Sequence, residues 1–129
     1  MVLDTSALLA LLLDEPEAEA FRAAVEDDPT RLVSAATLLE TALVIEARKG
    51  EPGGRELDLL IHKADVVVVP VDTEHVARAR KAYRRYGKGR HEAGLNFGDV
   101  FAYALARASG ESLLFKGDDF SKTDVGRVI

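Results

Sequence analysis

Five carboxylates occupy positions from which they could act together. Asp4 follows a short apolar segment, and Asp118 and Asp119 follow another one near the C-terminus, whereas Glu40 and Asp99 lie in segments with helical patterns. The carboxyl ends of parallel strands form the usual binding crevice of an α/β sheet, so acids there share one edge. Carboxylates gathered without histidine or cysteine favour Mg²⁺ or Mn²⁺ over zinc. Such a site suits phosphoryl chemistry.

Each acid also has an ordinary structural explanation. Asp4 is a suitable helix cap, Asp99 would be stabilised by the positive end of its helix, and the Asp118–Asp119 pair fits a turn. Glu40 is harder to explain, because a buried unpaired glutamate is costly unless it binds a metal or reaches solvent. Its predicted neighbours on the helix face are mostly apolar: Ala36, Thr37, Leu43, Val44 and Ala47.

The composition indicates one globular domain with an uneven distribution of charge. The chain has 129 residues, 47% of them apolar, and 22 acidic against 17 basic residues give a net charge of −5. Cysteine is absent, which excludes disulfides, zinc–cysteine sites and a thiol nucleophile. The three histidines are too scattered for a zinc–histidine cluster. The apolar run from Ala7 to Leu13 is too short to cross a membrane, so we expect a cytoplasmic protein.

One basic segment stands out against this acidic background. Seven lysines and arginines and no acid lie between Arg78 and His91. This segment predicts either a solvated helix face or a surface for the phosphates of RNA, which the acids themselves would repel. As RNA contacts we single out Arg84, Arg85, Lys88 and Arg90.

The hydrophobic pattern predicts the elements that must position these residues. Short apolar strands alternate with helices, which indicates a parallel sheet covered on both faces. We expect strands at 2–4, 32–35, 66–69 (fully buried), 112–115 and 125–129. We expect helices at 6–13, 16–26, 36–49, 55–64, 73–87 and 98–109, with a break at Pro52-Gly53-Gly54.

Four segments of the chain form a recognisable set: Val2 to Ser6, Ala36 to Glu40, Leu95 to Asp99, and Leu113 to Phe120. No single segment is specific, but the order and spacing of all four in a chain of this length are specific. Together they resemble the PIN domain, and more narrowly the VapC toxins of bacterial and archaeal toxin–antitoxin pairs.

The resemblance implies a single three-layer α/β/α domain over residues 1–129, with a mostly parallel sheet of about five strands. It implies an endoribonuclease dependent on Mg²⁺ or Mn²⁺, with Asp4, Glu40, Asp99 and Asp118 as catalytic acids and metal ligands. Asp119 could share the role of Asp118. Ser6 would support the first aspartate, and Asn96 matches a family position beside the third acid.

The resemblance also implies partners, and the residues leave other functions open. The implied partners are a tRNA or ribosomal RNA substrate, a cognate VapB-type antitoxin and a second copy of the chain. A metal-dependent phosphatase or phospho-acceptor domain is one alternative, although such a phosphatase typically has an aspartate where this chain has Ser6. A non-catalytic module that binds RNA or protein is the other.

Overall fold

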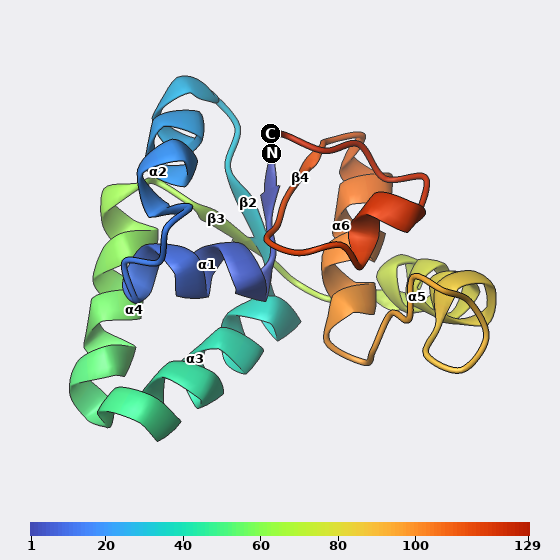
Figure 1. Cartoon of the computed structure of the whole chain (residues 1–129), viewed down its shortest axis with the longest axis horizontal. Coiled ribbons are helices and arrows are strands. Elements are labelled where there is room, and N and C mark those ends of the chain that lie inside the picture. Colours follow the sequence, from blue (N-terminus) through green and yellow to red (C-terminus); the bar gives the residue numbers. More distant parts are fainter.

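Short strands alternate with helices in the computed structural model, which describes residues 1–129 (Figure 1). In chain order the elements are β1 (Val2–Leu3), α1 (Thr5–Leu12), α2 (Ala18–Asp27), β2 (Leu32–Ser34), α3 (Ala35–Lys49), α4 (Glu51–Lys63), β3 (Val67–Val69), α5 (Thr73–Tyr86), α6 (Asp99–Ser109), β4 (Leu113–Leu114) and the 3₁₀ turn η1 (Phe120–Lys122). No helix combines the length and the apolar character needed to cross a membrane.

The four strands form one parallel sheet in the order β3-β2-β1-β4. The predicted α/β class and parallel sheet are therefore confirmed, with four strands in place of about five. The segment expected to form a fifth strand, 125–129, contributes only an isolated parallel bridge between Leu113 and Arg127. Parallel pairing places the carboxyl ends of β1, β2 and β4 at one edge of the sheet.

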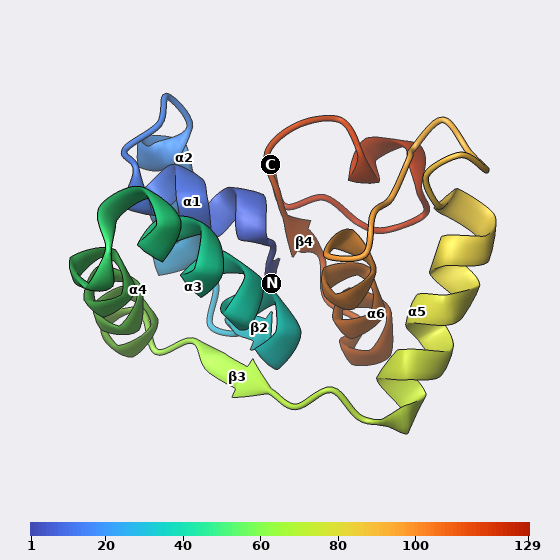
Figure 2. The same ribbon diagram turned by 90° about the horizontal axis from the view of Figure 1, so that it is seen from below.

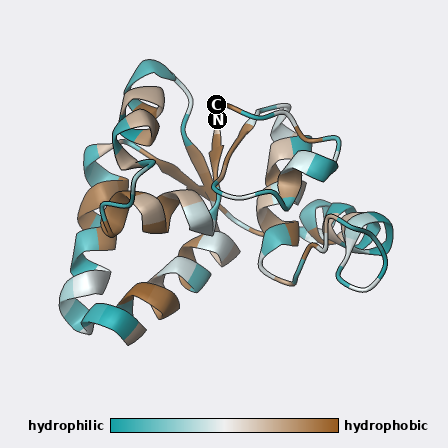
Figure 3. Ribbon diagram, viewed as in Figure 1, coloured by the Kyte–Doolittle hydropathy of each residue, from teal (hydrophilic) through white to brown (hydrophobic).

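The central strands are hydrophobic along their length (Figure 3), and alternation of their side chains produces two apolar cores. Val2 and Leu113 pack into the core beneath α5 and α6, whereas Leu3, Val33 and Leu114 pack against α1 and α2 on the other face. This is the period-two pattern of a sheet covered on both sides. Figure 2 shows α1, α3 and α4 on one side of the strands and α5 and α6 on the other, which gives three layers.

The helix α4 begins earlier than the sequence predicts. The Pro52-Gly53-Gly54 segment lies inside the first turn of α4 rather than breaking the chain before it. Proline is tolerated in that position because its missing N–H has no helical partner there. A Cβ atom on Gly53 would lie 2.9 Å from the carbonyl oxygen of Ile45, so this glycine permits the close approach of α3 and α4.

The strand β3 is exposed, contrary to the prediction that it is fully buried. It pairs only with β2 and forms an edge of the sheet, and 58% of Val67 is accessible to solvent. A run of β-branched residues fits an edge strand as well as a central one, so composition alone did not distinguish them.

The buried face of α3 also differs from the predicted one. Thr37, Thr41 and Ile45 are buried, whereas Leu43 is 64% exposed. The Thr41 hydroxyl donates to the Thr37 carbonyl oxygen (2.8 Å), so the Thr41 side chain is satisfied within the helix and can pack inward, whereas the buried Thr37 hydroxyl has no hydrogen-bond partner. Glu40 consequently lies at the border of the buried face rather than at its centre.

Candidate active site

Asp4 lies at the carboxyl end of the central strand β1 and caps the helix α1. Its Oδ2 accepts hydrogen bonds from the Ser6 backbone N–H (3.0 Å) and from the Ser6 hydroxyl (2.7 Å). The Ser6 hydroxyl oxygen in turn accepts from the Lys116 backbone N–H (2.9 Å), just beyond β4. Only 4% of Asp4 is accessible to solvent. The hydrogen bonds from Ser6, which is itself held by the Lys116 backbone N–H, thus fix the orientation of the buried Asp4 carboxylate.

Glu40 reaches the same region from α3. Its Oε1 accepts a hydrogen bond from the Thr5 hydroxyl, on the residue after Asp4. Its carboxylate also lies against the backbone of Gly98, at the start of α6: a Cβ atom built there would be 2.0 Å from Glu40 Oε2. Glycine at position 98 is therefore what leaves room for the Glu40 carboxylate.

Asp99 begins α6 in a reciprocal arrangement with Asn96. The Asn96 backbone N–H donates to Asp99 Oδ2 (3.0 Å), and the Asp99 backbone N–H donates to Asn96 Oδ1 (2.9 Å). This is the pattern of a helix capping box, with asparagine and aspartate as its two members. Asp99 is half-buried at the positive end of a helix dipole, which favours a negative charge there.

The two adjacent aspartates after β4 are placed differently. Both are exposed. The charge of Asp119 acts on Asp99. The Asp118 backbone carbonyl accepts from the Ser121 hydroxyl (2.6 Å) and holds the following 3₁₀ turn. Of the pair, Asp119 is thus the one whose charge contributes to the raised pKa of Asp99.

The four acids affect one another electrostatically near the carboxyl ends of the strands, and we call the region between them the acidic crevice. Burial raises the pKa of Asp4 to about 6, against the effect of the Ser6 hydrogen bonds, and the charges of Asp99 and Glu40 add to the rise. Burial likewise raises the pKa of Asp99 to about 6, with contributions from Asp119 and Glu40. Near pH 7 this crevice concentrates negative charge that is incompletely compensated by the protein.

The hydrogen bonds leave one oxygen of each principal acid without a protein partner. Asp4 Oδ2, Glu40 Oε1 and Asp99 Oδ2 accept bonds from neighbouring groups, and the second oxygen of each accepts none. No lysine or arginine forms an ion pair with any of them. Hard oxygen donors without a counter-charge fit Mg²⁺ or Mn²⁺. No three of them converge closely enough to hold an ion as they stand, so binding would have to draw them together.

The basic segment does not form one face. Arg84 lines a groove between α5 and α6, whereas Arg85 lies on the opposite side of α5, within 3.9 Å of Asp124. Arg90 stacks over the ring of Tyr83. Lys88 is exposed in the loop after α5. Two of the four predicted RNA contacts, Arg84 and Arg85, therefore lie on different surfaces.

Sequence reasoning missed two residues that position the acids. Thr5 is not among the predicted site residues, yet its hydroxyl holds Glu40, 35 residues away. Gly98 is not among them either, although its lack of a side chain admits the Glu40 carboxylate. The sequence offers two signals for these residues: a hydroxyl next to an aspartate at a strand end, and a glycine next to an aspartate at a helix start. Neither signal indicates that the residue contacts Glu40.

Comparison with known proteins agrees with this geometry. The PIN domain family model matches residues 1–126. The chain is 63% identical over 128 residues to Ribonuclease VapC of Mycolicibacterium smegmatis, covering 99% of both chains. It is 64% identical to Ribonuclease VapC30 of Mycobacterium tuberculosis, covering 99% of this chain and 98% of that one.

Solved structures with low sequence identity share the fold. The crystal structure of Mycobacterium tuberculosis VapC20, a toxin that cleaves the sarcin–ricin loop, superposes with a TM-score of 0.78 at 20% identity, covering 96% of this chain and 95% of that one. The VapBC2 complex of Rickettsia felis, bound to a DNA fragment of its promoter, gives a TM-score of 0.73 at 13% identity, covering 94% and 90%. With the family model matched over nearly the whole chain, this protein belongs to the PIN-domain family and, within it, to the VapC ribonucleases.

Proposed function

We propose that this VapC-family protein is an endoribonuclease that depends on Mg²⁺ or Mn²⁺ held by Asp4, Glu40, Asp99 and Asp119. The observation that carries the proposal is the set of carboxylate oxygens that have neither a hydrogen-bond donor nor a basic partner. We favour Asp119 over Asp118 as the fourth acid, because the Asp119 charge acts on Asp99. When bound, the cation would supply an activated water and would offset charge that develops on the phosphate.

The chain's own residues would keep the acids in position throughout the reaction. Ser6 holds Asp4, Thr5 holds Glu40, and Asn96 holds Asp99, each through a hydrogen bond. Groups that orient metal-binding side chains in this way typically contribute about 10- to 100-fold to affinity or activity.

We expect water rather than a protein side chain to be the nucleophile. The Ser6 hydroxyl is engaged between Asp4 and the Lys116 N–H. His91 packs edge-on against Tyr86 and accepts from the Ala93 N–H, away from Ser6. In-line attack by water on the phosphorus would leave a 5′-phosphate and a 3′-hydroxyl. Attack by the ribose 2′-hydroxyl would instead leave a cyclic phosphate.

The experiment is RNA cleavage with end-group analysis. The purified protein should cleave RNA in Mg²⁺ or Mn²⁺, lose the activity in EDTA, and leave 5′-phosphate ends. Asp99→Asn should abolish cleavage, whereas Asp58→Asn, which removes an exposed carboxylate from α4, should not. Undiminished cleavage in EDTA, or cyclic phosphate ends, would contradict the mechanism.

The same assays separate the alternative functions. A phosphatase or phospho-acceptor domain would release phosphate from p-nitrophenyl phosphate or retain it covalently, without cutting RNA. A non-catalytic module would bind RNA and leave it intact at every metal concentration.

We further propose that the protein is the toxin of a toxin–antitoxin pair, acting in the cytoplasm on tRNA or ribosomal RNA. Support comes from the relatives named VapC and from structural neighbours crystallised as toxin–antitoxin complexes, VapBC2 and a complex from Klebsiella pneumoniae. A VapB-type antitoxin and a second copy of the chain are the expected protein partners. Co-expression with the neighbouring small reading frame should relieve growth arrest, and light scattering of the toxin should give the mass of a dimer.

A further inference from the structure

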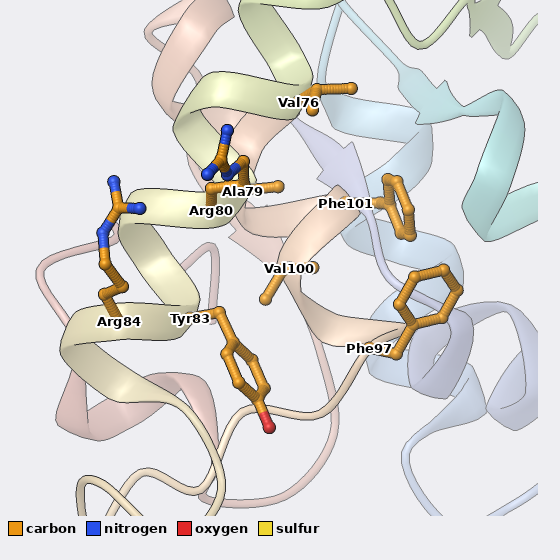
Figure 4. A pocket seen from close by; sticks show the side chains of 8 residues that line it. All are labelled: Val76, Ala79, Arg80, Tyr83, Arg84, Phe97, Val100 and Phe101. Atoms are coloured by element: carbon orange, nitrogen blue, oxygen red, sulfur yellow. The ribbon is translucent and has the colours of Figure 1, made fainter.

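An apolar groove lies beside the acidic crevice, between α5 and α6 (Figure 4). Its volume is about 640 Å³, within the range of small-molecule sites. Val76 and Tyr83 of α5 form one wall, and Phe97 and Phe101 form the other. No carboxylate lines it, in contrast to the crevice next to it.

Phe97 connects the groove to the crevice. It lies two residues before Asp99, inside the turn that the reciprocal Asn96–Asp99 hydrogen bonds hold rigid. Its ring is 77% exposed, the most exposed large apolar side chain in the protein. Phe101 supports the ring from one side in an edge-to-face arrangement, with centroids 5.0 Å apart. An aromatic face is thus presented to solvent at a fixed place next to a proposed metal ligand.

Two arginines give the groove its charge. Arg80 and Arg84 line it, and neither forms an ion pair within the chain. By contrast, Arg78 pairs with Glu74, and Arg85 and Arg107 lie near Asp124. Aromatic faces for stacking together with cations for the backbone are the combination found in proteins that bind single-stranded nucleic acids.

We propose that this groove binds the unpaired bases of the RNA next to the scissile phosphate, with Phe97 stacking on a base and Arg80 and Arg84 contacting the backbone. The proposal rests on the metal-dependent cleavage proposed above. Phe97 lies in the same turn as Asp99 and also lines the groove, so a strand bound at Asp99 that runs toward the groove would meet the Phe97 ring. Stacking tolerates any base, so the groove would position the strand without reading its sequence.

The test compares binding of two RNAs that differ only in their bases. One is a 12-residue oligouridylate and the other is an abasic ribose-phosphate chain of the same length. Binding is measured in Mg²⁺ with Asp4→Asn as the background, so that the RNA stays intact. Phe97→Ala should weaken binding of the oligouridylate by about 5- to 100-fold. It should leave binding of the abasic chain unchanged. Phe97→Tyr, which keeps the ring, should bind both as the background does.

Matched variants identify the source of any loss. Leu59→Ala removes an exposed apolar side chain from α4 and should change neither affinity, whereas Arg84→Gln should weaken both RNAs alike. Equal loss of both RNAs in Phe97→Ala would overturn the proposal. The proposal would also be overturned if Phe97→Ala left the affinity for both RNAs unchanged and instead dissociated a dimer of the protein. The groove would then be a contact between two copies of the chain. Absence of RNA cleavage by the unmutated protein would refute the proposed function, whereas the base-dependent binding would still report on the groove.

Discussion

Replacing Asp4 with asparagine should stabilise the metal-free protein at neutral pH. Burial and the nearby charges of Asp99 and Glu40 raise the pKa of Asp4 from 3.8 to about 6, which outweighs the stabilising hydrogen bonds from Ser6. The rise corresponds to about 3 kcal/mol of folding free energy lost when this carboxyl ionises. Asparagine has a similar shape and no charge, and its amide oxygen can still accept both bonds from Ser6.

The gain in stability of Asp4→Asn is smaller than the full cost of the buried charge, because the substitution still buries a polar group. Part of the 3 kcal/mol is offset by the cost of burying an amide, so we expect about 1 to 3 kcal/mol at pH 7.5. For a domain of this length that gain raises the melting temperature by about 3 to 10 °C. Asp58→Asn, at an exposed site on α4, should change it by less than about 2 °C.

The pH dependence distinguishes this explanation from a general improvement in packing. The folded protein binds the Asp4 proton more tightly than the unfolded chain, so the carboxyl costs nothing below pH 3.8 and its full cost is reached as the pH rises through about 6. The stability of Asp4→Asn relative to the unmutated protein should therefore be lowest near pH 4, rise between pH 4 and pH 6, and be highest above pH 7.

The assay is urea or thermal unfolding in EDTA between pH 4 and pH 8, repeated in Mg²⁺. Added Mg²⁺ should stabilise the unmutated protein, because a bound cation replaces the proton as counter-charge. It should stabilise Asp4→Asn much less. A variant that loses stability at pH 7.5, or a difference that does not change with pH, would refute the reasoning and make Asp4 a structural cap alone.

Two further predictions follow from single contacts. Gly98→Ala should lower Mg²⁺ affinity, measured by calorimetry, by about 10- to 100-fold with little change in stability, because the new methyl group displaces only the flexible Glu40 carboxylate; an unchanged affinity would show that Glu40 does not bind the metal. Arg84→Gln should reduce the log–log salt slope of single-stranded RNA binding by about 0.7, and Arg85→Gln, close to Asp124, by less. Equal effects would mean that both faces of α5 contact RNA.

The fold, and the positions of Asp4 and Asp99 within it, could be predicted from the sequence because they depend on local patterns. Asp4 follows an apolar strand, and the alternation of strands with helices implies a parallel sheet whose carboxyl ends meet at one edge. The side chains that hold the acids depend on contacts between distant segments. Thr5 reaches Glu40 only because α1 packs across α3, and Gly98 meets Glu40 only because α6 begins beside that helix. A single sequence carries no signal for such pairs.

The errors have a different physical origin. The Val66–Val69 run was read as buried from its apolar character, but burial of a strand depends on its place in the sheet, and β3 is an edge. The apolar face of α3 was predicted around Glu40, with Leu43 and Val44 on it, whereas Thr41 satisfies its hydroxyl within the helix and packs inward. In both cases the pattern predicted the type of element correctly, but the prediction of which side chains are buried was wrong.

The hydrogen bonds of the crevice explain how the fold tolerates its acids while keeping them available. Every donor to Asp4, Glu40 and Asp99 is an uncharged hydroxyl or backbone N–H. Uncharged donors fix a carboxylate without cancelling its charge, whereas a lysine or arginine would both fix it and compete with a cation. The chain does use basic partners elsewhere, since Lys116, whose backbone supports Ser6, directs its ammonium group to Glu15 and Glu17. The repulsion left in the crevice is therefore energy that cation binding can release, which is why stability, pH and metal should be coupled at Asp4.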